Sequence, residues 1–195
     1  MLDEQASGSM NSVKKKPVQL LLLFVMLLFT PATFILMGLH LGFFNDVTVT
    51  EEQGLQVKAV LIKHQGDYAR GGKYIPQVGD YLKVNYQVDC KPISVYMNDT
   101  AKVIKKMLES YHGCLVNPEI PVKSNQKVTV KTFSWNEVHF KAHIKAHPSI
   151  AIIKASSELK KVIKEQNKDL VYPIISILEP GANFTYFAKA TKVSQ

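Results

Sequence analysis

VLIKHQGDY (60–68) decides the fold, because an apolar run ends in a bend within it. The residues leading into it, QVKAVLIK (56–63), are typical of a β-strand, and Gly66 predicts a tight turn directly after that strand. The next apolar pattern, IPQVGDYLK (75–83), has helical spacing. The stretch therefore predicts a strand that turns into a helix.

The same nine residues contain a histidine, an acid and a phenol: His64, Asp67 and Tyr68. A catalytic cluster is the alternative to a strand end here, but no nucleophile lies close in sequence. The chain also lacks G-x-S-x-G, a P-loop, C-x-x-C and H-E-x-x-H. We expect no catalysis, no cofactor and no catalytic residue.

The rest of the chain alternates strand and helix patterns. ISVYM (93–97) predicts a strand, and NDTAKVIKKMLESYHG (98–113) predicts a helix with an N-cap at its start and a glycine at its end. The later segments predict two strands, a helix and a strand pair, at 127–133, 137–145, 149–167, 171–178 and 183–190. The plan is β-α-β-β twice over, an α+β fold with an antiparallel sheet backed by two helices.

Three histidines, His139, His143 and His147, recur at every fourth residue. On a helix this spacing would suit a metal. The alternation of Val138 and Phe140 with polar residues predicts a strand instead, where residues four apart are about 13 Å apart, too far to share one ion. We expect no metal site and solvent-facing histidines.

Residues 18–44 carry no charged side chain and are longer than the roughly 20 apolar residues that span a bilayer. They predict a single-pass signal-anchor helix, with a cleaved signal peptide as the alternative. The domains are then a cytoplasmic tail (1–17), a transmembrane anchor (18–44) and a folded domain (53–190).

The lysines Lys14, Lys15 and Lys16 precede this span, and no lysine follows it until Lys58. The positive-inside rule therefore places the N-terminus in the cytoplasm and the domain on the periplasmic, luminal or extracellular side. There Cys90 and Cys114 form either a disulfide or a free pair.

The net charge of +8 comes from 24 basic and 16 acidic residues. Arg70 is the only arginine. Arginine is the residue best suited to pair with base edges, so we expect no nucleic-acid binding. Attraction to anionic lipid headgroups needs no such pairing.

His64-Gln65-Gly66-Asp67-Tyr68 after a strand resembles the H-x-G-x-Y signature of the GyrI-like small-molecule-binding domain family, an effector-binding domain. ISVYMND (93–99) and YPIISIL (172–178) resemble two further strand segments of that family, over roughly 53–190. With the N-terminal span, the likeness is to its membrane-anchored branch, which includes the testis-expressed reticulophagy receptor.

The resemblance implies a duplicated fold whose sheet and helices enclose a cleft for lipophilic, often cationic molecules, with a buried glutamate as counter-charge. Ser176 occupies the position of that glutamate here and Leu178 that of a following tyrosine. This departure favours a neutral ligand over a cation. The expected lining is aromatic and polar: Tyr68, Tyr96, Trp135, Tyr172 and Ser176.

The sequence thus predicts a membrane-anchored, non-catalytic binding domain for a small apolar or amphipathic ligand. One alternative is an anchored domain that binds a protein partner, its cleft filled by its own side chains. A second alternative is a hydrolase that uses the cleft.

Overall fold

The computed structural model describes residues 15–192, and residues 1–14, where most of the predicted tail (1–17) lies, are outside it. The chain divides into two units, 1–44 and 45–195. In the first, α1 (Lys15–His40) contains Pro31. Within the described residues, no helix has both the length and the apolar character needed to cross a membrane. The anchor predicted over 18–44 therefore stays a prediction.

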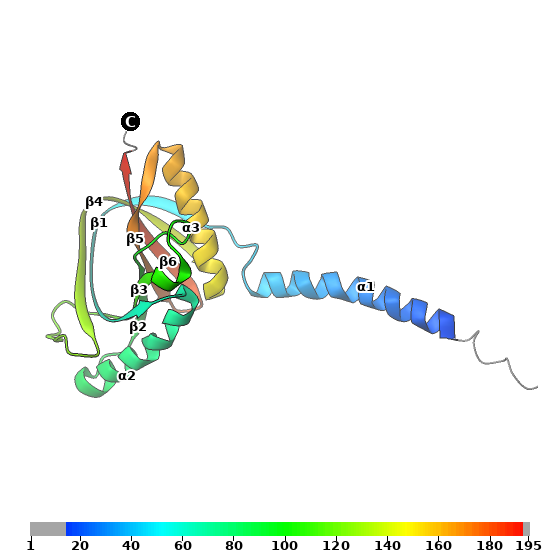
Figure 1. The fold of residues 1–195 in the computed structure, drawn as a ribbon, viewed down its shortest axis with the longest axis horizontal. Coiled ribbons are helices and arrows are strands. Elements are labelled where there is room, and N and C mark those ends of the chain that lie inside the picture. The colour runs from blue at the N-terminus through cyan, green and yellow to red at the C-terminus, as the bar shows by residue number, and fades with distance from the viewer. Residues whose placement is uncertain (1–14, 193–195) are drawn as a thin grey trace, which may run out of the picture. The chain divides into compact units, whose positions relative to one another are not determined.

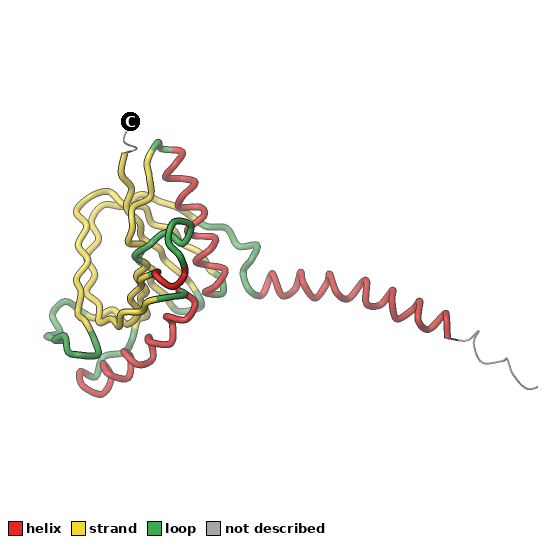
Figure 2. Tube along the Cα trace, viewed as in Figure 1, coloured by secondary structure: helices red, strands yellow, loops and turns green. Residues whose placement is uncertain are grey.

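The second unit is a six-stranded antiparallel barrel with two longer helices (Figures 1 and 2). Its strands lie in the order β1-β3-β2-β5-β6-β4 around the closed sheet. Along the chain the elements are β1 (Thr48–Gln65), η1 (Tyr68–Lys73), α2 (Tyr74–Tyr86), β2 (Lys91–Tyr96), η2 (Lys105–Met107), β3 (Glu109–Val116), β4 (Thr129–Lys145), α3 (Pro148–Glu165), β5 (Lys168–Glu179) and β6 (Asn183–Lys192). The predicted plan is confirmed as β1-α2-β2-β3 followed by β4-α3-β5-β6.

Alternation along the strands divides the core into one inner and two outer clusters. The inner cluster, whose buried members include Leu61, Trp135 and Phe187, comes from strands alone, so it fills the barrel. The two outer clusters each include a helix. α2 packs on β1 and β3, and α3 packs on β4, β5 and β6 (Figure 1).

The helix predicted over 98–113 is wrong. Residues 97–108 form a loop with one short turn, η2, and β3 follows at Glu109–Val116. The predicted C-terminal glycine, Gly113, instead lies in the ladder, where a Cβ would come within 2.0 Å of the Val60 carbonyl oxygen. Pairing of β3 with both β1 and β2 outweighs the local helical pattern.

The two strands predicted at 127–133 and 137–145 are one, β4. His139 lies on a strand as predicted but is fully buried, not solvent-facing, and neither ring nitrogen has a hydrogen-bond partner in the described part of the chain. It faces the barrel interior, with its ring centroid 5.8 Å from that of Trp135. His143 and His147 are exposed, as predicted.

The sequence left open whether Cys90 and Cys114 form a disulfide or stay free. In the structure they form a disulfide. Cys90 and Cys114 are bonded 24 residues apart in sequence. The bond lies against α2, since a Cβ on Gly79 would be 3.3 Å from the Cys90 Cβ. It joins the segment that follows α2 to the centre of β3.

Candidate functional site

A row of polar side chains crosses four neighbouring strands on the outer face of the barrel. Ser94 on β2 lies opposite His112 on β3 and Ser176 on β5, and Ser176 lies opposite Tyr186 on β6. Across the sheet the order is His112, Ser94, Ser176 and Tyr186, and the two serines face each other where β2 pairs with β5. We call these four residues the polar row.

Three of the four residues of the polar row are buried, Ser94 is partly buried, and the row is internally hydrogen-bonded. His112 is 1% exposed, Ser176 5% and Tyr186 1%. The Ser94 Oγ lies 2.8 Å from His112 Nδ1, and the Ser110 Oγ lies 2.8 Å from His112 Nε2. The Tyr186 hydroxyl is hydrogen-bonded to Ser176. Each polar group here is satisfied by a neighbour.

The polar row carries no charge at neutral pH. Burial, with a smaller effect from nearby His64, lowers the pKa of His112 to about 4. Burial raises the pKa of Tyr186. Ser94 and His112 are at nucleophile–base distance, but the second nitrogen of the ring is bonded to Ser110 and not to an orienting carboxylate. The row therefore offers neutral donors and acceptors.

The segment from His64 to the end of η1 covers the His112 end of the polar row, and we call it the roof. The His64 Nε2 lies 2.9 Å from the Asp67 carbonyl oxygen, and the Asp67 carboxylate accepts a hydrogen bond from the Ala69 N–H at the start of η1. In η1, Gly71 lies so close to His112 that a Cβ would be 1.9 Å from its Nε2. His64 and Asp67 thus shape the turn between strand and helix, as predicted.

The loop of residues 97–108, here called the lid loop, covers the site next to this roof. The Tyr68 hydroxyl donates a hydrogen bond to the Asn98 carbonyl at 2.9 Å and accepts one from the Asn98 N–H at 3.0 Å. The Tyr68 ring packs on Tyr96, with centroids 4.9 Å apart. The aromatic pair therefore lies directly beneath the lid loop.

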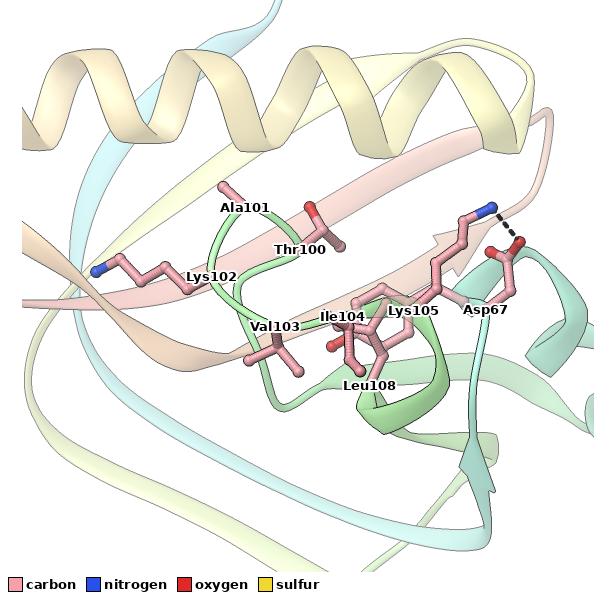
Figure 3. Close-up of a pocket in the computed structure, with 9 residues that line it drawn as sticks. Asp67, Thr100, Ala101, Lys102, Val103, Ile104, Lys105 and Leu108 are labelled. Carbon is pink, nitrogen blue, oxygen red and sulfur yellow. Dashed lines mark hydrogen bonds and ion pairs between the residues drawn. The ribbon is translucent and has the colours of Figure 1, made fainter.

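Two ion pairs attach the lid loop to its surroundings. Lys105 pairs with Asp67 (Figure 3), with Nζ and Oδ2 2.7 Å apart, and Asp99 Oδ1 lies 3.0 Å from Nζ of Lys160 on α3. Burial raises the pKa of Asp99, but the Ala101 N–H and Lys160 outweigh it, so that the pKa is lowered overall. Both carboxylates are ionised and paired at neutral pH.

A hollow of about 460 Å³ opens at the lid loop (Figure 3). Its lining joins η1 to the lid loop: Asp67, Tyr68, Thr100, Ala101, Lys102, Val103, Ile104, Lys105 and Leu108. Volumes of this size fall within the range of small-molecule sites. The hollow lies over Tyr68, at the edge of the buried site.

Four of the five residues predicted to line a ligand site gather on this face. The Tyr68 and Tyr96 rings are in tilted contact, Ser176 lies in the polar row, and Tyr172 lies near Asp99. Burial, followed by the charge of Asp99, raises the pKa of Tyr172. The fifth, Trp135, belongs to the inner cluster and lies on the other side of the sheet.

The prediction missed Ser94, His112 and Tyr186. They are brought together by the pairing of β3, β2, β5 and β6, and no motif in the sequence indicates that register. The alternation of Ser110 and His112 with apolar residues was the available signal, but those residues had been assigned to a helix.

No family model matches the sequence, and no curated protein matches it significantly. Solved structures do resemble it. The EcmrR C-terminal domain aligns with a TM-score of 0.52 at 13% identity, over 76% of this chain and 99% of that one. EcmrR in a complex with DNA aligns with a TM-score of 0.54 at 12% identity, over 91% of this chain and 69% of that one. A hydrolase from Listeria innocua aligns with a TM-score of 0.50 at 8% identity, over 74% of this chain and 92% of that one.

At these identities the likeness shows the fold alone. The shared fold is that of the EcmrR C-terminal domain, and it is compatible with the GyrI-like fold expected from the sequence. It does not bear on the membrane-anchored branch of that family.

Proposed function

We propose that the domain is a non-catalytic binding module for a small, neutral, apolar or amphipathic molecule. The ligand lies on the outer face of the barrel, against the polar row and the contacting rings of Tyr68 and Tyr96. The observation that carries this proposal is the row itself, four uncharged polar side chains aligned across the sheet beside an aromatic pair. Ligand sites typically combine an apolar lining with a few convergent polar groups.

The charges around the site favour a neutral ligand. A cation that enters a buried site needs a carboxylate as partner. Here the carboxylates that border the site, Asp67 and Asp99, are already paired with Lys105 and Lys160. Ser176 supplies only a hydroxyl where relatives with the GyrI-like fold are expected to have an acid. A neutral molecule needs no new counter-charge.

A ligand reaches the polar row when the lid loop moves. In the structure this loop is held by the exposed Lys105–Asp67 ion pair, which is weak, by the partly buried Lys160–Asp99 pair and by the Tyr68–Asn98 hydrogen bonds. Entry therefore requires the loss of a few surface contacts and leaves the barrel intact. The hollow lined by Val103 marks the entrance.

The second candidate is a domain that binds a protein partner with its cleft filled. The specific observation in its favour is that Ser176 is only 5% exposed and is bonded to Tyr186, so the space beside it is occupied in this conformation. Under this alternative the lid loop stays closed and small molecules do not enter.

A matched pair of valine substitutions distinguishes the two. The neutral dye N-phenyl-1-naphthylamine is added to the full chain with Val103→Trp, which fills the hollow, or with Val84→Trp at a position of α2 that is 81% exposed. Binding in the wild type and in Val84→Trp, with loss in Val103→Trp, supports the proposal. Equal dye binding by all three chains, together with no retained molecule in native mass spectrometry, refutes it.

We also propose that residues 18–44 anchor the chain, with the N-terminus in the cytoplasm and the domain on the opposite side. The Cys90–Cys114 disulfide supports this placement, since structural disulfides are rare in reducing compartments. The test is labelling of these cysteines, after reduction, by an impermeant thiol reagent in intact and lysed cells. Labelling confined to lysed cells would contradict a domain on the cell surface, and protease protection in isolated organelles then tests a luminal one.

A further inference from the structure

The lid loop presents two large apolar side chains to solvent. Ile104 is 66% exposed and Met107 is 62% exposed, and both lie on or beside the short turn η2. The buried end of the same loop is Leu108, at 2% exposure. The loop therefore contributes Met97 and Leu108 to the core and directs Ile104 and Met107 outward.

Lysines flank these two side chains. Within residues 102–107 the order is Lys-Val-Ile-Lys-Lys-Met, and Lys102, Lys105 and Lys106 are all exposed. We call these six residues the lid tip.

The carboxylates around the lid tip are already neutralised. Asp99 pairs with Lys160, and Glu109 pairs with Lys63. Asp67 pairs with Lys105, which leaves Lys102 and Lys106 as positive charge in excess of nearby acids. The lid tip is thus an apolar point surrounded by positive charge.

We infer that the lid tip docks on a bilayer that contains anionic lipid, with Ile104 and Met107 entering the headgroup region and Lys102 and Lys106 close to lipid phosphates. Exposed apolar side chains beside lysines are the combination by which peripheral segments bind such surfaces. The charge complementarity favours this occupant over an apolar protein partner. Lysine is a point charge on a flexible stem. It therefore suits the mobile phosphates of lipid headgroups better than it suits a fixed acceptor that needs two parallel hydrogen bonds. The inference is independent of whether a small molecule binds beneath the loop.

The test uses the full chain reconstituted in vesicles, with a local probe, so that insertion of the N-terminal helix alone gives no signal. An environment-sensitive nitrobenzoxadiazole dye is attached at Met107→Cys. The matched control carries the same dye at Val84→Cys, which is at least as exposed but lies on α2. Vesicles contain phosphatidylcholine alone or with one quarter phosphatidylserine.

We expect the dye at position 107 to shift to the blue in the anionic vesicles and to be quenched by brominated acyl chains, while the dye at 84 stays in water. Lys102→Gln with Lys106→Gln should reduce the bound fraction relative to the unbound fraction at least tenfold, since each lysine near an anionic surface contributes about fivefold. Salt at 0.5 M should weaken docking in the same direction.

Three outcomes would overturn the inference. The first is a dye at 107 that stays water-exposed at every lipid composition. The second is an equal shift at 84, which would indicate general adsorption of the domain. The third is a shift that follows the number of protein molecules per vesicle and not lipid charge, which would assign the lid tip to a contact between two copies of the chain.

Discussion

Replacement of Gly71 by alanine tests whether the roof over the polar row is as tight as the structure shows. The new Cβ would lie 1.9, 2.4 and 2.6 Å from three atoms of the His112 ring. Ordinary van der Waals contact begins at about 3.4 Å, so the ring or η1 must move by more than 1 Å. The ring cannot withdraw freely, because it is 1% exposed and both its nitrogens are bonded to serines.

The expected cost has two parts. Overpacking of a filled core typically costs 1–3 kcal/mol. A displaced ring also loses at least one of its two hydrogen bonds, at about 1 kcal/mol. Gly71→Ala should therefore lower the free energy of unfolding by about 2–4 kcal/mol.

Gly72 is the matched control, since a Cβ there meets nothing within 4 Å. Gly72→Ala should be neutral or stabilising by about 0.5 kcal/mol, because alanine restricts the unfolded chain. Urea unfolding of both full-length variants is followed by the fluorescence of Trp135, the only tryptophan, which lies inside the barrel. Equal midpoints for Gly71→Ala and Gly72→Ala would refute the tight roof.

Three further predictions concern pH, the disulfide and the lid loop. His112 has a folded-state pKa of about 4, below its usual 6.5, so the unfolded state takes up a proton first: the stability from this residue is complete above pH 6.5 and falls by about 3 kcal/mol as the pH drops to 4. Urea unfolding at several pH values should show this slope, and His112→Gln should lack it. Cys90→Ala with Cys114→Ala should lower the free energy of unfolding by about 3 kcal/mol, the entropy of the released loop, and a midpoint unchanged by reduction would contradict this. Asp99→Asn removes the Lys160 ion pair and should speed amide hydrogen exchange in the lid loop about fivefold, with no change in β4; uniform acceleration would instead indicate general destabilisation.

The strand and helix order was predictable because most segments have one dominant period. α2 and α3 have helical spacing over more than three turns, and β6 follows the turn at 180–182. The helix prediction for residues 98–113 was wrong because the residues taken as its N-cap and its C-terminal glycine have other roles in the structure. The Asp99 carboxylate accepts a hydrogen bond from the Ala101 N–H within a turn, and Gly113 allows β1 and β3 to approach.

The sequence could indicate single residues of the candidate site, but not the residues that strand pairing brings together. Tyr68 and Ser176 could be chosen because the segments that contain them resemble motifs of the GyrI-like family. The polar row could not, because it depends on strand pairing as distant in sequence as that of Ser94 with Ser176. A change of one residue in register would turn each side chain to the other face. Trp135 was misplaced for the same reason, since its face of β4 is set by pairing with β1.

The two joins between the halves of the barrel are unequal in length. β1 and β4 pair over thirteen residue positions, whereas β2 and β5 pair over four, from Ile93 to Tyr96. Fewer ladder hydrogen bonds hold the shorter join, so it separates at lower free energy than the longer one. Because Ser94 and Ser176 face each other across the short join, its separation would widen the polar row and would also open the inner cluster that both halves share.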